Sequence, residues 1–149
     1  MNEPKNDLGA VETSKLQDKK KGSTTSALKL GAAWMRGQII PLSEASIPVN
    51  DWGLVRSDIT YDVVPVINGG FFRLSNYIDR FVASMKGLKL EPQLSKNAIE
   101  NALLEMVGAS GLRNSYVTMV CSRGIPAIPG SRDPRECENY FYAWCVPYI

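Results

Sequence analysis

Histidine is absent from the 149-residue chain, which excludes Ser-His-Asp triads, Cys-His pairs and histidine-ligated metal sites. No apolar run approaches the roughly 20 residues that a membrane-spanning helix needs. The apolar segment of a secretory signal is also missing. The three cysteines are an odd number without a Cys-x-x-Cys pair, which argues against a disulfide framework or a zinc ribbon. The sequence therefore predicts a cytoplasmic protein with reduced thiols and no membrane partner.

The chain also has little excess charge of either sign, because its 17 basic and 15 acidic residues leave a net charge of only +2. So small an excess predicts no nucleic-acid partner. Residues 1–27 carry many of these charges and no aromatic side chain. Such a composition cannot bury enough apolar surface to offset the entropy of ordering the chain. We therefore expect residues 1–27 to form a disordered polar tail.

From residue 28 onward, apolar residues recur with the spacing of regular elements. Asn68-Gly69-Gly70 predicts a tight hairpin, because such a turn needs positive φ angles. Ser75 and Ser95 are each placed as the N-cap of a helix. The remaining pattern predicts strands at 33–35, 39–40, 59–67, 71–74, 116–121 and 140–146 around helices at 75–87 and 95–108. This order predicts an α+β fold, with a mainly antiparallel sheet and two helices on one face.

The last strand, at 140–146, is apolar almost throughout and ends close to the terminus. It either pairs within the first sheet or begins a second one. We predict the second arrangement, with a small α+β domain at 28–121, an interdomain loop at 122–138 and the first strand of a truncated large domain at 139–149.

No self-contained catalytic motif is present, because Gly69-Gly70 lacks the rest of a P-loop and there is no Gly-x-Gly-x-x-Gly segment. Asp58 and Asp62 are four residues apart on one face of a predicted strand, where carboxylates are usually solvated. Arg80, considered alone, is expected to be a solvent-facing helix residue.

Several short motifs nevertheless occur together in a specific order. They are Gly53-Leu54, Ser57-Asp58, Thr60-Tyr61-Asp62, Asn68-Gly69, Phe72-Arg73-Leu74, Ile78-Asp79-Arg80-Phe81 and Arg123-Gly124. Their order and spacing over residues 32–149 resemble the N-terminal part of the fold-type IV pyridoxal-phosphate enzymes. That family contains branched-chain aminotransferases, D-amino acid transaminases, (R)-selective amine transaminases and aminodeoxychorismate lyases.

The resemblance implies a role for five residues. Arg80 matches the arginine that binds the phosphate of pyridoxal 5'-phosphate, and a guanidinium fork suits a dianionic phosphate. Arg56, Tyr61, Tyr116 and Thr118 match positions that line the substrate pocket. Tyr116 and Thr118 are two apart in a strand and therefore share a face.

The resemblance also implies that the chain is incomplete as an enzyme. In the family, the lysine that forms the Schiff base lies in a second domain, whereas the last lysine here is Lys96 on the second predicted helix. We therefore expect an N-terminal fragment that is inactive alone. The intact protein is expected to be a homodimer that moves an amino group between an amine or amino acid and a keto acid. The alternatives are a fragment of a D-amino acid transaminase or an aminodeoxychorismate lyase, or a non-catalytic α+β interaction module.

Overall fold

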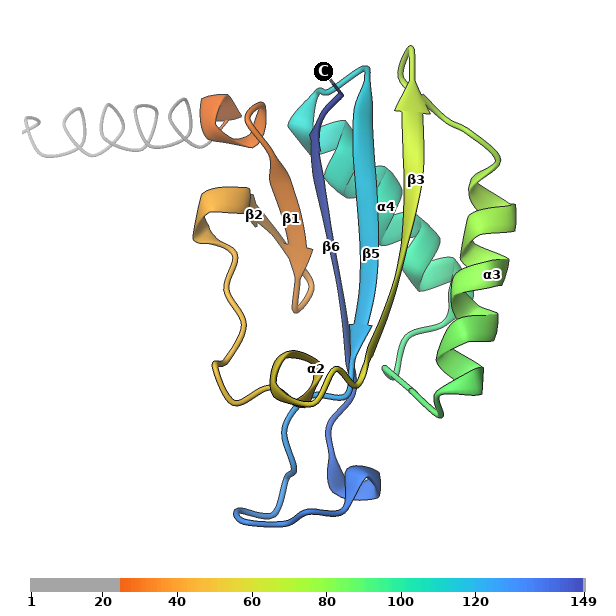
Figure 1. Cartoon of the computed structure of the whole chain (residues 1–149). Coiled ribbons are helices and arrows are strands. Elements are labelled where there is room, and N and C mark those ends of the chain that lie inside the picture. Colours follow the sequence, from red (N-terminus) through yellow and green to blue (C-terminus); the bar gives the residue numbers. More distant parts are fainter. Residues whose placement is uncertain (1–24, 149) are drawn as a thin grey trace, which may run out of the picture.

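The computed structural model describes residues 25–148, and these form a single six-stranded antiparallel sheet with helices packed against it (Figure 1). The strand order is β2-β1-β6-β5-β3-β4. The strands are β1 (Ala32–Met35), β2 (Gln38–Pro41), β3 (Ile59–Ile67), β4 (Gly70–Phe71), β5 (Ser115–Ser122) and β6 (Tyr140–Pro147). The α-helices are α2 (Trp52–Val55), α3 (Leu74–Gly87) and α4 (Lys96–Ser110), and short 3-10 turns lie at Leu42–Glu44 and Pro134–Glu136.

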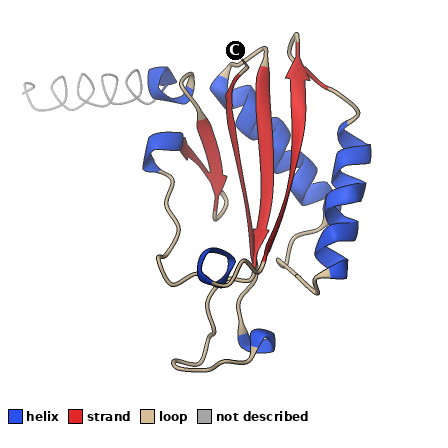
Figure 2. Ribbon diagram, viewed as in Figure 1, coloured by secondary structure: helices blue, strands red, loops and turns tan. Residues whose placement is uncertain are grey.

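Helices α3 and α4 cover one face of the sheet, and the other face is left open toward the viewer of Figure 2. Each helix buries one apolar stripe, because residues three and four apart lie on the same side of a helix. The buried stripes are Ile78, Phe81 and Met85 in α3 and Ile99, Leu103 and Met106 in α4. The predicted α+β class, with two helices on one face of an antiparallel sheet, is confirmed.

The observed ends of the helices agree only in part with those predicted from the sequence. Ser95 caps α4 as predicted, with its side chain accepting a hydrogen bond from the Ala98 N–H at 3.1 Å. Helix α3 instead begins directly after Arg73, whose backbone is left-handed, so Ser75 lies inside the first turn. Helix α4 continues to Ser110 and ends at Gly111, where a φ of +67° suits glycine.

Strand β6 corrects the predicted domain division. It pairs with β5 along its whole length and with β1 on its other side, so it lies within the first sheet. Residues 139–149 therefore do not begin a second sheet, and residues 122–138 connect two strands of one sheet. The strand is apolar because it has neighbours on both sides and aromatic or apolar surroundings on both faces.

The alternation of side chains along the strands separates the two faces. Phe141, Ala143 and Cys145 of β6 point into the core beneath the helices, and the residues between them point to the open face.

Of the predicted tail, residues 1–24 lie outside the described part of the chain, and residues 25–28 form a helical turn. No helix within residues 25–148 has the length and apolar character needed to cross a membrane.

Candidate functional site

The open face of the sheet brings together three of the five predicted site residues. Tyr61 of β3 projects to this face and is 68% exposed. In the register of β3 and β5, Tyr61 lies opposite Val120, Val63 opposite Thr118 and Pro65 opposite Tyr116. Residues opposite each other or two apart share a face, so Tyr61, Thr118 and Tyr116 line one surface. The predicted grouping of these three residues is therefore geometrically possible.

Aromatic side chains extend this surface across β6. Trp144 lies opposite Thr118, and Tyr142 lies opposite Val120. The rings of Tyr140 and Tyr142 stack with centroids 5.8 Å apart, and those of Tyr116 and Tyr148 lie 4.5 Å apart. A hydrogen bond with Tyr148 raises the pKa of the Tyr116 phenol above its usual value. The Tyr116 phenol therefore stays protonated near neutral pH and can donate a hydrogen bond to a bound anion.

Arg80 forms a bidentate ion pair with Asp62. Its Nε and Nη2 each donate a hydrogen bond of 2.7 Å to one carboxylate oxygen. This hydrogen bonding raises the pKa of the guanidinium, whose carbon also lies 4.9 Å from the centre of the Tyr77 ring. The expectation of a solvated Asp62 is wrong, because the carboxylate is largely buried and holds the arginine in place.

Arg80 and Tyr61 lie on different sides of β3. Asp62 faces the helices together with Val64 and Val66, so Arg80 is held on the helix side, whereas Tyr61 faces the open side. Within the described residues, β4 pairs with β3 only at Val66 and Ile67, which leaves the other part of that edge free. A molecule that contacts both Tyr61 and Arg80 must therefore lie against the free edge of β3.

Asp58 anchors a second arginine at the end of the sheet where β3 begins and β5 ends, which is called the lower end below. Nε and Nη2 of Arg123 donate to its carboxylate at 2.8 and 3.1 Å, and Arg123 also donates to the carbonyl oxygens of Leu88 and Lys89 at 2.7 and 2.8 Å. The Asn139 side chain donates to the Arg123 carbonyl at 2.9 Å. Asp58 is therefore not simply solvated either, since this network ties β3, β5 and two loops together.

Asp51, which is fully buried, forms a third polar cluster at the same end. It accepts hydrogen bonds from the Gly53 N–H at 2.8 Å, the Ser122 hydroxyl at 2.5 Å and the Tyr140 hydroxyl at 2.7 Å. Burial and this hydrogen bond raise the pKa of Tyr140 well above its usual range. The cluster holds the start of α2 against the ends of β5 and β6.

Two glycines of the sequence motifs are required by close approaches at this end. A Cβ atom on Gly53 would lie 2.2 Å from the Ser122 hydroxyl oxygen. Gly124 has a φ of +78°, and a Cβ there would lie 2.0 Å from the Glu138 carbonyl oxygen. The Gly53 and Arg123-Gly124 motifs are thus explained by packing of the scaffold beneath the open face.

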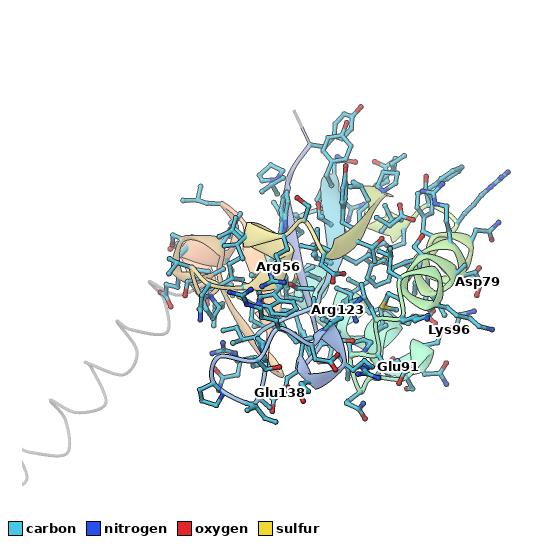
Figure 3. All side chains as sticks on the ribbon, turned by 60° about the horizontal axis from the view of Figure 1, so that its bottom comes forward. Arg56, Asp79, Glu91, Lys96, Arg123 and Glu138 are labelled. Carbon is cyan, nitrogen blue, oxygen red and sulfur yellow. The ribbon has the colours of Figure 1, made fainter. Side chains whose placement is uncertain are left out.

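Arg56, the fifth predicted site residue, lies at this end beside α2. Its guanidinium carbon is 3.6 Å from the centre of the Trp52 ring, which is a close cation–π stack. Figure 3 shows Arg56 and Arg123 at the same end of the molecule, close to the loop that carries Glu138. Arg56 therefore lies below the face that holds Tyr61 and Thr118.

Lys96 lies far from the open face, as its position on the second helix predicts. It begins α4 and forms an ion pair with Asp79 of α3 (Figure 3). Within residues 25–148, no group of three or more metal-ligating side chains could hold a metal ion. The functional groups of the candidate site are therefore the guanidinium groups, the carboxylates and the phenols described above, and the open face that carries the phenols is aromatic.

Sequence comparison identifies relatives that are named as aminotransferases. The family model described as amino-transferase class IV matches residues 60–143. A provisionally named branched-chain-amino-acid aminotransferase of Methanocaldococcus jannaschii is 29% identical over 104 residues, which is 70% of this chain and 35% of that protein. D-alanine aminotransferase of Staphylococcus aureus is 24% identical over 115 residues, or 77% of this chain and 41% of that protein.

Solved structures show the same fold. The T.th. branched-chain amino acid aminotransferase with pyridoxamine 5'-phosphate superposes with a TM-score of 0.72 at 22% identity, over 80% of this chain and 40% of that one. The branched-chain amino acid aminotransferase of Escherichia coli superposes with a TM-score of 0.70 at 13% identity, over 80% of this chain and 41% of that one. This chain therefore spans well under half the length of these proteins. The family model covers more than half of the chain, and the chain belongs to the class IV aminotransferase family.

Proposed function

We propose that this chain is the N-terminal part of a pyridoxal-phosphate-dependent aminotransferase that moves an amino group between an amine or amino acid and a keto acid. One structural observation supports the proposal above the others. Tyr61, Tyr116 and Thr118 share an open aromatic face, and Arg80 lies at the free edge of the same strand as Tyr61. The names of the relatives, and the pyridoxamine 5'-phosphate in a structural neighbour, agree with this chemistry.

Arg80 fits a phosphate group in part. Its Nε and Nη2 are engaged by Asp62, and among the described residues no acceptor contacts Nη1, so Nη1 and the exposed edge of the guanidinium remain available. The side chain is 65% exposed. Asp62 orients the fork, and Arg80 would then hold one phosphate oxygen at the edge of β3.

The other predicted pocket residues would shape the space beside the cofactor. The Tyr61 and Tyr116 phenols and the Thr118 hydroxyl can donate hydrogen bonds to a substrate, and the aromatic surface around them excludes water. Bound pyridoxal phosphate supplies the electron sink for transamination. The lysine that binds the cofactor covalently and the acidic residue that pairs with its ring nitrogen are expected outside the described residues. Lys96 is not a candidate, because it pairs with Asp79 of α3, away from the open face.

The wider assignments follow from the family. We propose a homodimer in the cytoplasm, without a nucleic-acid or membrane partner, in which the open face meets the rest of the active site. The relatives named as D-alanine aminotransferases support a D-amino acid as a second candidate substrate. An aminodeoxychorismate lyase and a non-catalytic interaction module remain outcomes of the experiments below.

Cofactor titration of the protein extended beyond Ile149 tests the role of Arg80. Arg80→Ala should weaken pyridoxal-phosphate binding by at least about tenfold, because a charge-assisted contact is lost. Arg36→Ala is the matched control, since Arg36 is an exposed arginine on the β1–β2 turn. Equal affinity of the parent and the Arg80 variant would refute the assignment. Failure of the parent to bind cofactor would favour the interaction module.

The isolated 149-residue chain provides a second test. It should show no transaminase activity, because Lys96, the last lysine of the sequence, lies at the start of α4 and pairs with Asp79 of α3. Incubation with cofactor followed by borohydride should leave no site-specific pyridoxyl-lysine. Stoichiometric labelling of one lysine would show that the chain is catalytically more complete than we propose.

A further inference from the structure

A groove on the helix side of the molecule lies outside the candidate functional site. It is formed by α3, the connection at residues 88–95 and the start of α4, and it has a volume of about 380 Å³. This volume is within the range of small-molecule sites in proteins. Figure 3 shows Glu91 and Lys96, which both line the groove, on the side of the molecule away from Arg56.

The floor of the groove is apolar and firmly held. None of its side chains can donate a hydrogen bond, and they are Val82, Met85, Leu90, Pro92, Leu94 and Ile99. Met85, Leu90 and Ile99 are at most 5% exposed, so the floor is the outer surface of the core. The Leu90 N–H donates to the Met85 carbonyl at 2.9 Å, which ties the connection to α3. Such a floor favours an alkyl chain over a polar group, which would lose its hydrogen bonds to water.

The rim of the groove is mainly cationic. The charged side chains that line it are three lysines and one glutamate: Lys86, Lys89, Lys96 and Glu91. Lys96 is already paired with Asp79. The exposed side chains of Lys86 and Lys89 make no hydrogen bond or ion pair with any residue between 25 and 148. Their ammonium groups are therefore accessible to an anionic ligand.

The fold holds these two lysines next to each other. The Lys89 N–H donates to the Lys86 carbonyl at 3.1 Å, and the Lys89 carbonyl accepts from Nη1 of Arg123 at 2.8 Å. Lys89 has a left-handed backbone with a φ of +54°. A residue other than glycine keeps this conformation only where its surroundings enforce it. The start of both side chains is therefore fixed before a ligand arrives, which lowers the entropy lost on binding.

We propose that this groove binds a medium-chain fatty acid, with its carboxylate on Lys86 and Lys89 and its alkyl chain along the apolar floor. Two neighbouring ammonium groups suit one carboxylate, and the floor stabilises a hydrocarbon tail. Glu91 lies at the same rim and repels further negative charge, so a monoanion fits better than a dianionic phosphate. The site is separate from the open face, and the proposal does not depend on the proposed function.

Titration of the 149-residue chain with octanoate, followed by NMR, tests the binding directly. We expect saturable shifts of the backbone signals of the floor residues, and none with acetate at the same concentration. Lys86→Gln and Lys89→Gln should each weaken octanoate binding about threefold, and the double variant should weaken it about tenfold. Lys29→Gln is the matched control at an exposed lysine outside the groove, and it should bind like the parent chain.

The alkyl tail and the charge at the rim can be tested separately. Hexanoate should bind the parent about fivefold more weakly than octanoate, because two methylene groups fewer are buried. Val82→Thr keeps the side-chain volume but places a hydroxyl on the floor, so it should weaken octanoate binding about threefold. Glu91→Gln should tighten octanoate binding about twofold, because it removes a like charge. Urea unfolding of each variant confirms that the chain remains folded.

Four results would overturn the proposal. They are the absence of saturable shifts with octanoate, equal binding of octanoate and neutral 1-octanol, unchanged octanoate binding in the double lysine variant, and tighter binding of inorganic phosphate than of octanoate. Phosphatidylglycerol vesicles provide a further test. Lysine-dependent binding to these vesicles without saturable binding of free octanoate would identify the groove as a membrane-facing surface and refute the fatty-acid site.

Discussion

The two faces of the sheet come from the same strands and differ in how far their side chains are buried. On the helix side, Val64, Val66 and Val117 are fully buried against α3 and α4. On the open side, Tyr61 and Tyr116 are exposed large side chains of the same strands. Because side chains alternate along a strand, one sequence can encode a stable core and a binding surface residue by residue. Substitutions on the helix side should therefore reduce stability, and those on the open side should reduce binding.

The largest expected effect comes from neighbouring residues of β6 on opposite faces. Phe141 is 3% exposed and packs against Trp34 and Phe81, with ring centroids 5.6 and 6.0 Å away. Phe141→Ala should lower the free energy of unfolding by about 3–5 kcal/mol. Tyr142→Ala, on the open face, should cost only about 1–2 kcal/mol. Urea unfolding of both variants measures the difference, and equal losses would contradict the division between the faces.

The next effect concerns the polar network at the lower end. Arg123→Gln leaves Asp58 without its cation and two carbonyl groups without a donor, so we expect a loss of about 3 kcal/mol in unfolding free energy. Arg135→Gln is the control, because the Arg135–Asp133 pair is exposed and local and should contribute little. Similar midpoints for the two variants would show that the network does not stabilise the scaffold.

A smaller, pH-dependent effect arises from the buried thiol of Cys121. Burial raises its pKa from the usual 9.0 to about 12. Between these values the unfolded thiol is ionised and the folded one is not, so the unfolded state binds fewer protons. Stability should therefore fall as pH rises through this window, by up to about 1.4 kcal/mol per pH unit from this group.

Replacement of Cys121 isolates this contribution. Cys121→Ala should flatten the decline in unfolding free energy above about pH 9, compared with the parent. Cys137→Ala is the control at a less buried thiol, and it should change the slope less. Parallel pH profiles of the parent and Cys121→Ala would contradict the expected proton linkage.

The helices and the hairpin can be predicted from the sequence because their signals are local. Ile78, Phe81 and Met85 follow helical spacing, and Asn68-Gly69 marks the turn after β3. The strand at 140–146 is predicted, but its assignment to a second sheet is wrong. Its core-facing Phe141 and its outward-facing Tyr142 are both aromatic, so the sequence alone does not show which face of the strand joins the existing core.

The polar clusters escape prediction for a different reason. Arg123 and Asp58 are 65 residues apart, and Tyr140 and Asp51 are 89 apart, so no local pattern connects the partners. The Gly53 and Arg123-Gly124 motifs are visible in the sequence, but their structural purpose requires the fold. The five predicted site residues rest on the family resemblance, and the structure adds the separation of Arg80 from Tyr61 by the free edge of β3.

The central claim, that the open face serves function and contributes little stability, is tested most directly by Tyr61→Phe. This change removes one exposed hydroxyl, so the unfolding free energy of the 149-residue chain should change by less than about 0.5 kcal/mol. In the protein extended beyond Ile149, kcat/KM for amino transfer should fall by about tenfold or more, because a hydrogen bond to the substrate is lost. An unchanged kcat/KM, or a stability loss as large as that of Phe141→Ala, would contradict the claim.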